Sequence, residues 1–383
     1  MPHKIQVDHI PAGYALHSGC GGDNLECALC EFTSTEDGQL FISRLEGIPQ
    51  MLIGKLPREL KASASTTDNL LAIFYADKSA TVYYNEFYPK VTARAKKDIQ
   101  KGDLVMLDDI SDIDRISLDG IDIPQNAGIC YVFSFGWRKG FFYDFSPLQT
   151  GEHHCERTYD LGTVLADCWA RVLFQERFSV SEAAWEQMFR QRWFPFSSLP
   201  RDLTNQIISF AEESRPIGVD IEVFRDHVIE VVGKRLKQWE RESAFIEHLP
   251  ILSAAYERFV AGDDLSAMAI LYPRIEGIIR SHQLAATPDA PMKQAQFATS
   301  GSGAGHPSLR ATSTFLPERF RKYLEEVFFG NFDPKTKPSI ASRHTVAHGV
   351  APIDSFNRMN ATLGFLTLLQ VSTVIRMTAD TKE

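Results

Sequence analysis

The stretch that decides the fold of the N-terminal half reads Ile129-Cys-Tyr-Val-Phe-Ser-Phe135, Gly136-Trp-Arg-Lys-Gly140, Phe141-Phe-Tyr-Asp-Phe145. Two aromatic-rich runs flank a short segment that begins and ends with glycine, and this spacing predicts a β-hairpin. Glycine suits those positions because it adopts backbone angles that a bulkier residue resists. The aromatic side chains are expected to pack in a core, with stacking on a base or a ligand as the alternative.

This hairpin belongs to a longer series of short β segments with turn residues between them. They extend over about Glu31–Gln149 and include Leu70–Tyr75, Ala80–Tyr84 and Leu104–Leu107. Gly120–Gly128 has the composition of a loop. The sequence therefore predicts a β-rich domain over residues 1–155, and a role as a sensor or regulator that binds a ligand or a protein is one hypothesis for it.

The hydrophobic pattern changes from a period of two toward 3.6 after residues 151–160, which indicates helices. Predicted helices cover Leu161–Phe174, Ser181–Arg192, Leu203–Glu213, Ile221–Lys237, Glu240–Leu249 and Ile251–Ala261. We expect a helical connecting region over residues 156–250 and a helical domain over 251–383. The predicted fold class is α+β, with a β-rich domain followed by an all-α region.

Within the C-terminal domain, Asp263 and Asp264 are expected to begin a helix that runs to Arg280, because acidic side chains favour the helix N-terminus. Pro273 should kink this helix. Residues 285–314 are rich in Ala, Ser, Gly, Thr and Pro, a composition that predicts a flexible insertion.

Three further helices are predicted near the C-terminus. The first covers Phe315–Phe329 and carries both signs of charge. Ser339 is expected to cap a short second helix, and Asp354 or Ser355 a final apolar helix that runs to about Met377.

Bulk properties narrow the class of protein. The 383 residues, 44% hydrophobic and 23% charged, are typical of a soluble globular chain with two or three domains. No apolar run reaches the roughly 18 to 20 residues of a membrane span, and the N-terminus lacks the apolar core of a secretory signal. We therefore expect a cytoplasmic location, no membrane contact and reduced cysteines.

Charge limits the surface that nucleic acid could use. The formal net charge is -9, whereas affinity for phosphate backbones comes largely from clustered Lys and Arg. Any RNA contact is therefore expected to be local. Arg319, Arg321 and Lys322 could form a small RNA-binding patch, or they could be a solvated helix face.

The candidate chemistry lies in Ser342-Arg343-His344-Thr345-Val346-Ala347-His348-Gly349. On a helix, His344 and His348 are four residues apart and share one face. Imidazole exchanges protons near neutral pH, and Arg343 can bind phosphate oxygens through two donors. These are the groups that RNA cleavage without a metal requires. The alternative is that the three side chains only cap and hydrogen-bond a helix end, with Gly349 as its terminator.

This stretch resembles the signature of HEPN (higher eukaryotes and prokaryotes nucleotide-binding) domains: Arg343, the polar His344, a three-residue spacer and His348. The preceding helix with Leu271–Arg280 and the following apolar helix match the setting of that motif. The resemblance covers about Ile251–Thr378. It implies a HEPN-like helical bundle.

The resemblance also implies a function. Many such domains are metal-independent endoribonucleases of antiviral defence or toxin systems, without a cofactor, and act as homodimers whose two motifs meet. Arg343 would then orient and neutralise the scissile phosphate of an RNA substrate, His348 would transfer protons, and His344 would position it. The product would carry a 2′,3′-cyclic phosphate. The alternative is a catalytically silent module that binds a nucleotide, RNA or a protein partner.

Glu276 could support the motif by pairing with Arg343, which would fix the guanidinium. A surface pair with Arg280, one helical turn away, is the alternative.

Other patterns carry weaker predictions. Cys20, Cys27 and Cys30 could bind zinc, with His17 or the remote His153, His154 and Cys155 as further ligands, although unpaired thiols are the simpler interpretation. His344 and His348 have the spacing of a helical zinc site, but the glutamate that follows the first histidine in such sites is absent. No Gly-x4-Gly-Lys-Ser/Thr loop is present, which disfavours an NTPase.

Overall fold

The chain forms two compact units in the computed structural model, which describes residues 2–11, 13–148, 156–289, 293–310, 312–333, 335–336 and 338–379. Unit 1 contains Met1–Ala95 and Asp112–Ser179, and unit 2 contains Lys96–Ser111 and Val180–Glu383. The boundary that the sequence suggested at residue 155 lies outside the described residues, and the units divide after Ser179.

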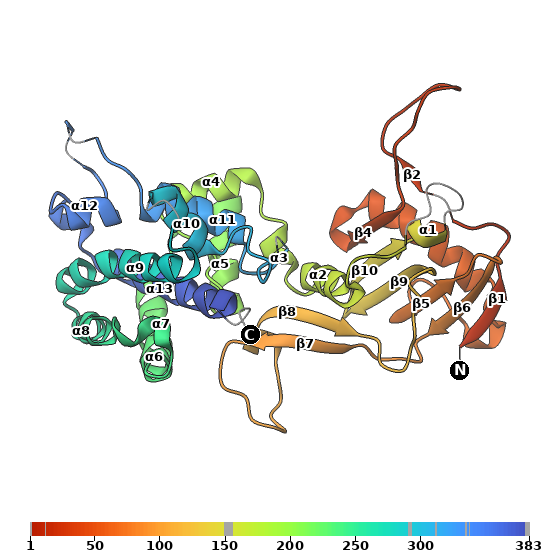
Figure 1. The fold of residues 1–383 in the computed structure, drawn as a ribbon, viewed down its shortest axis with the longest axis horizontal. Coiled ribbons are helices and arrows are strands. Elements are labelled where there is room, and N and C mark those ends of the chain that lie inside the picture. Colours follow the sequence, from red (N-terminus) through yellow and green to blue (C-terminus); the bar gives the residue numbers. More distant parts are fainter. Residues whose placement is uncertain are drawn as a thin grey trace. The chain divides into compact units, whose positions relative to one another are not determined.

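Unit 1 is built on a six-stranded sheet in the order β1-β6-β5-β9-β10-β4, with antiparallel neighbours throughout. Its strands are β1 (His3–Gln6), β4 (Cys30–Ser34), β5 (Asn69–Phe74), β6 (Ser79–Tyr84), β9 (Gly128–Phe135) and β10 (Arg138–Asp144). Two further pairs are β2 (Tyr14–Ala15) with β3 (Cys27–Ala28) and β7 (Lys90–Ala95) with β8 (Ile110–Ser117). Figure 1 shows the strands of the large sheet side by side.

The predicted hairpin is confirmed as β9 and β10. Phe135 lies opposite Arg138, so Gly136 and Trp137 form a two-residue turn, and Gly136 has a φ of +60°. Gly140 is required for a different reason, which is space. A Cβ atom there would lie 2.4 Å from the ring of Phe133.

Helices bury both faces of the sheet, which explains why β5 is buried along its whole length and apolar from Leu70 to Phe74. Val132 belongs to the core that includes Leu52 of α1 (Gln39–Gly54). Its neighbour Phe133 points to the opposite face. There it stacks on Trp169 of α2 (Leu161–Leu173), with ring centroids 4.9 Å apart and an interplanar angle of 7°. Unit 1 also contains α3 (Gln175–Phe178).

Two sequence predictions for unit 1 need correction. The helix α1 lies inside a region that was predicted to consist of short β segments, and Leu104–Leu107 is not a strand. Pro49 lies within α1, and the helix was not predicted because proline normally ends helices. The aromatic side chains of the hairpin are mostly buried, as predicted, with Phe135 and Trp137 exposed.

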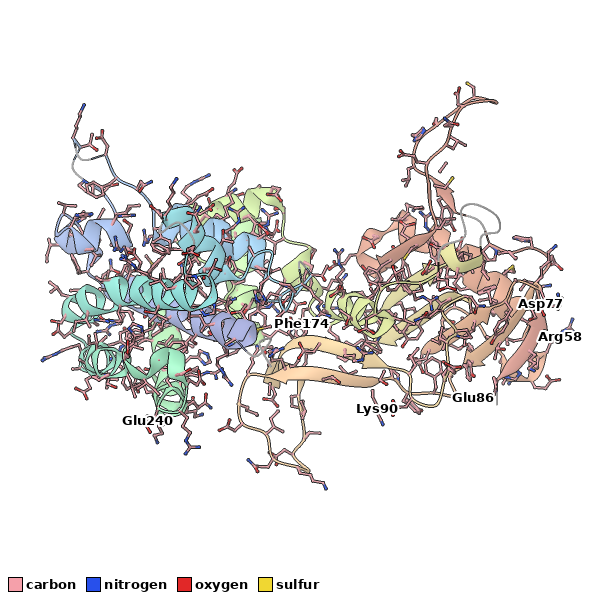
Figure 2. All side chains as sticks on the ribbon, viewed as in Figure 1. Arg58, Asp77, Glu86, Lys90, Phe174 and Glu240 are labelled. Carbon is pink, nitrogen blue, oxygen red and sulfur yellow. The ribbon has the colours of Figure 1, made fainter. Side chains whose placement is uncertain are left out.

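The described part of unit 1 also contains the 3-10 helices η1 (Thr35–Asp37), η2 (Arg58–Leu60) and η4 (Ser146–Leu148), and η3 (Leu107–Asp109) belongs to unit 2. Charged side chains such as Asp77 and Lys90, and Glu240 in unit 2, point outward into solvent (Figure 2).

Unit 2 is helical, which confirms the predicted α+β class. Its helices are α4 (Glu182–Arg190), α5 (Arg201–Glu212), α6 (Ile221–Trp239), α7 (Ser243–Ile246), α8 (Leu249–Val260), α9 (Asp264–Ala286), α10 (Gln294–Ser302), α11 (Pro317–Tyr323), η5 (Leu324–Phe328, a π-helix), α12 (Arg343–Ala347), η6 (Ile353–Ser355) and α13 (Arg358–Ala379). α9 packs against α8, α12 and α13 (Figure 1).

The helix α13 forms the centre of unit 2. Among the described residues it is the one helix long and apolar enough to cross a membrane, but 89% of its apolar window is buried in the protein, as in a core helix. Its first turn is capped by Asn357, whose Oδ1 accepts a hydrogen bond from the N–H of Asn360 at 3.0 Å. The predicted caps Asp354 and Ser355 instead lie in η6.

The predicted flexible insertion is wrong over α10. This helix packs against α9, α11 and α13, and Phe297 and Ala298 are buried. Small residues serve close packing here, because a Cβ atom on Gly301 would lie 2.8 Å from Ile279. The described residues 287–289 and 293 flank α10 without regular structure.

Candidate functional site

The motif lies on a short helix whose start is fixed by Ser342. The hydroxyl of Ser342 accepts a hydrogen bond from the N–H of Thr345 at 3.3 Å, and the Thr345 hydroxyl oxygen accepts one from the N–H of Ser342 at 2.7 Å. This is a capping box with threonine in place of glutamate. Gly349 ends the segment with a φ of +69°. The cap is therefore Ser342 and not the predicted Ser339.

Arg343 pairs with Glu276 of α9, as one of the two sequence hypotheses predicted. Its Nη2 donates to Oε1 at 2.6 Å, and its Nε lies against Oε2. The side chains are 20% and 14% exposed, so the pair is largely removed from water. The contact joins residues 67 positions apart in the chain and holds α12 on α9.

The charge state of Glu276 reflects two opposing effects. Burial raises the pKa of its carboxyl group, while Arg343 and Arg280 act in the other direction by favouring the ionised form. Because burial is the larger effect, the attraction of the two cations offsets only part of the desolvation cost. Removal of either Glu276 or Arg343 alone would leave its partner uncompensated.

Hydrogen bonds determine the tautomer of His344. Gln294 of α10 donates from Nε2 to the carbonyl oxygen of Phe329 at 2.6 Å, so its Oε1 faces Nε2 of His344 at 2.9 Å. An amide oxygen only accepts, and Nε2 of His344 must therefore carry the proton. The other ring nitrogen, Nδ1, faces Nη1 of Arg343 at 3.5 Å.

The surroundings of His344 keep its imidazole neutral at pH 7. Burial, followed by the charges of Arg343 and His348, lowers the pKa of His344 below its ordinary value of 6.5. Both ring nitrogens already face a partner. His344 is thus placed to orient its neighbours rather than to exchange protons.

His348 is the exposed member of the motif. Its ring lies parallel to that of His344, with centroids 6.2 Å apart and an interplanar angle of 8°, which confirms that the two imidazoles share a face. Phe332 packs on it at 6.1 Å. Among the described residues, none makes a hydrogen bond to the His348 side chain, which leaves both ring nitrogens accessible.

Three residues of this site were not predicted from the sequence. Gln294 lies in the segment predicted to be flexible. The carbonyl oxygen of Phe329, which follows the π-helix η5, accepts the hydrogen bond from Gln294. Phe332 follows in the connection to α12. A π-helix interrupts the regular α-helical hydrogen bonds and recurs at functional sites, but no residue pattern predicted one here.

The basic residues of α11 do not form a free cationic patch. Arg319 pairs with Glu182, Arg321 with Glu318 at 3.1 Å and Glu325 at 2.7 Å, and Lys322 lies 3.8 Å from Glu326. The solvated, salt-bridged helix face is therefore the better interpretation of this segment.

Cysteine and histidine residues show no metal site in the described part of the chain. Cys20, Cys27 and Cys30 are exposed thiols without a disulfide. No group of three or more His, Cys, Asp or Glu residues gathers there in a geometry that could hold a metal ion. His153, His154 and Cys155 lie outside the described residues.

Searches for related proteins give no match: no family model, no curated protein and no solved structure resembles this chain. The function is therefore inferred from the geometry around Arg343.

Proposed function

We propose that unit 2 is a metal-independent endoribonuclease of HEPN type. The observation that supports this most is the contrast between the two stacked imidazoles. His344 is held neutral with both nitrogens engaged, whereas His348 is exposed and accessible. A guanidinium lies on the same short helix. This set supplies an oriented proton carrier next to a phosphate-binding cation.

The proposed reaction is an internal transfer on RNA. A base removes the proton of a ribose 2′-hydroxyl, and the 2′ oxygen attacks the adjacent phosphorus. The bond from phosphorus to the 5′ oxygen breaks, and an acid donates a proton to that oxygen. The products are a 2′,3′-cyclic phosphate and a 5′-hydroxyl, with charge on the phosphate neutralised by Arg343.

The reaction needs a base and an acid, and one chain presents one accessible imidazole in the motif. We therefore propose a homodimer in which the second copy supplies the second His348. Exposed apolar side chains flank α12 in the sequence and suit such an interface: Ile340 is 48% exposed, Val350 40% and Ile353 67%.

Glu276 positions Arg343 in this scheme. It engages Nε and Nη2, so Nη1, which faces Nδ1 of His344 at 3.5 Å and carries a second N–H, is the nitrogen that can donate to a phosphate while the pair stays intact. The fixed guanidinium loses less side-chain entropy when RNA binds.

The same contact favours a second candidate function. Two donors of Arg343 are already occupied by a carboxylate, which is what a structural role would require. The alternative is therefore a catalytically silent module that binds a nucleotide, RNA or a protein partner. A cytoplasmic role in antiviral or toxin-type defence, with unit 1 as a regulator, belongs to the first proposal.

An RNA cleavage assay with the purified full-length protein, in buffer with EDTA, tests the proposal. We expect His348→Ala and Arg343→Ala to lower the cleavage rate by about 10² to 10⁴-fold. The matched controls His9→Ala and Arg241→Ala change exposed residues outside the site and should cleave like the wild type. Equal cleavage by all five proteins would reject the assignment of the site.

A further inference from the structure

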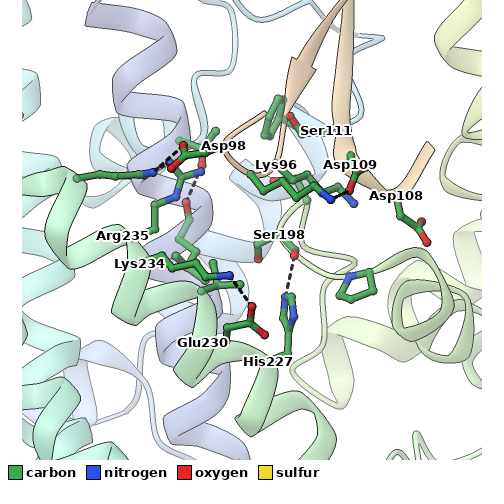
Figure 3. Close-up of a pocket in the computed structure, with 18 residues that line it drawn as sticks. Lys96, Asp98, Asp108, Asp109, Ser111, Ser198, His227, Glu230, Lys234 and Arg235 are labelled. Atoms are coloured by element: carbon green, nitrogen blue, oxygen red, sulfur yellow. Dashed lines mark hydrogen bonds and ion pairs between the residues drawn. The ribbon is translucent and has the colours of Figure 1, made fainter. Parts of the chain in front are cut away.

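A second, separate feature of unit 2 is a cavity of about 400 Å³ between α6, α13 and residues 96–111 (Figure 3). Its size falls in the range of small-molecule pockets, roughly 300 to 1,000 Å³. None of the motif residues lines it. The cavity therefore requires its own explanation.

One face of α6 supplies most of the polar wall. His227, Glu230, Lys234 and Gln238 recur at intervals of three or four residues and so project to the same side of the helix. Figure 3 shows His227, Glu230 and Lys234 along the cavity. The opposite lining is partly apolar and includes Phe315.

Arg235 is the strongest indication of a ligand. It is a half-buried guanidinium on this wall, and Nη1 donates to Oε1 of Gln238 at 2.8 Å. Among the described residues no carboxylate lies within ion-pair distance of it. Burial and then the nearby Arg376 lower its pKa, while the carboxylates of Glu242 and Asp98 act in the other direction. These carboxylates offset only part of the desolvation cost of the guanidinium, and an anionic ligand in direct contact with it would offset more.

Two other cations that line the cavity are paired within the protein. Lys234 pairs with Glu230 at 2.5 Å, and Lys97 pairs with Asp109 at 2.6 Å. Arg235 lies outside these pairs, as does Lys96, whose Nζ donates to the carbonyl oxygen of Leu199 at 3.0 Å. An incoming anion would meet the guanidinium of Arg235 on this wall. Exposed carboxylates at the rim, such as Asp108, are acceptors for ligand hydroxyl groups.

Two further groups in the cavity are suited to hydrogen bonds with a ligand. The hydroxyl of Ser198 is buried and has no partner among the described residues. His227 contacts the Ser198 carbonyl oxygen through Nε2 at 2.9 Å, so Nε2 carries the proton and Nδ1 is an acceptor when the ring is neutral. Burial lowers the pKa of His227 and favours that neutral form.

We propose that this cavity binds a small organic anion of the nucleoside monophosphate class. The phosphate lies at Arg235, the ribose hydroxyls meet the rim carboxylates, and the base lies between the apolar wall and the acceptors and donors of Ser198 and His227. This combination of a cation that makes no ion pair among the described residues, carboxylates and an apolar wall matches the three parts of such a ligand. The site is independent of the proposed ribonuclease motif.

Isothermal titration calorimetry on the full-length protein tests this, with AMP, GMP, CMP, UMP and inorganic phosphate as probes. We expect at least one nucleotide to bind the wild type and to bind Arg235→Gln at least about 10-fold more weakly, as expected for the loss of a charged hydrogen bond. The exposed Arg241→Gln is the matched control and should bind like the wild type.

A cavity-filling variant provides an independent test of the site if Arg235→Gln folds poorly. Val231 lines the cavity, and Val231→Trp should abolish binding while the circular dichroism spectrum stays helical. Three results would overturn the proposal: no binding of any nucleotide at about 1 mM, equal binding to wild type and Val231→Trp, or phosphate binding as tight as that of the best nucleotide. Binding that persists in Arg343→Ala separates this site from the motif.

Discussion

Replacement of Glu276 by leucine should destabilise unit 2 more than replacement of both Glu276 and Arg343. The single variant Glu276→Leu leaves a largely buried guanidinium without its carboxylate, and Arg343→Met leaves a largely buried carboxylate without its cation. The double variant removes both desolvation costs at once. The reasoning therefore predicts a strong departure from additivity.

The expected size follows from the exposure of the pair. Breaking a fully buried ion pair costs about 3 to 5 kcal/mol, and an exposed pair contributes about 1 kcal/mol or less. With side chains 20% and 14% exposed, each single variant should lose about 2 kcal/mol of unfolding free energy. The double variant should lose about 1 kcal/mol, which gives a coupling energy of about 3 kcal/mol.

Urea unfolding of the full-length protein, followed by the helical circular dichroism signal, measures these values. The matched control is the exposed pair of Arg319 and Glu182, with side chains 31% and 72% exposed. The cycle Arg319→Met and Glu182→Leu should give a coupling below about 1 kcal/mol. If the Arg343 cycle gave no more coupling than this control, the argument that desolvation dominates the pair would be refuted.

Three other predictions follow from single contacts. An NMR titration of the His344 imidazole should give a midpoint below pH 6.5. The lowered pKa of His344 therefore contributes folding stability that is present above pH 6.5 and is lost as the pH falls through the folded pKa. A midpoint at or above pH 6.5 would contradict the surroundings described for this side chain. Gly140→Ala should lower the unfolding free energy of the protein by about 1 to 3 kcal/mol because the new Cβ meets Phe133, and it should cost more than Gly136→Ala in the same urea experiment. Gln294→Leu should slow RNA cleavage about 10-fold by releasing His344, and an unchanged rate would disprove that positioning role.

Local patterns were sufficient to predict much of the fold. The hairpin of β9 and β10 was predictable because its alternation, turn glycine and aromatic residues agree. The helices α9 and α13 were also predictable from their hydrophobic period, although α9 continues through Pro273. Local rules failed where packing overrides them, as in α1 with Pro49 and in α10 with its small residues.

The candidate site was also predictable only in part, from local patterns and not from contacts between distant residues. The spacing of His344 and His348 on one helical turn correctly predicted that their rings share a face. The pairing of Arg343 with Glu276 could be stated only as one of two options, because contacts between distant residues depend on how α12 lies on α9. The contact with Gln294 was not predictable, since a neutral amide carries no charge pattern.

The most direct test of the central claim is the chemical identity of the RNA ends that the wild-type protein produces in the presence of EDTA. We predict a 2′,3′-cyclic phosphate and a 5′-hydroxyl, identified by mass spectrometry of a short defined RNA, and no such product with His348→Ala. Intact RNA after incubation with the wild type, or the same cyclic product from His348→Ala, would contradict the claim.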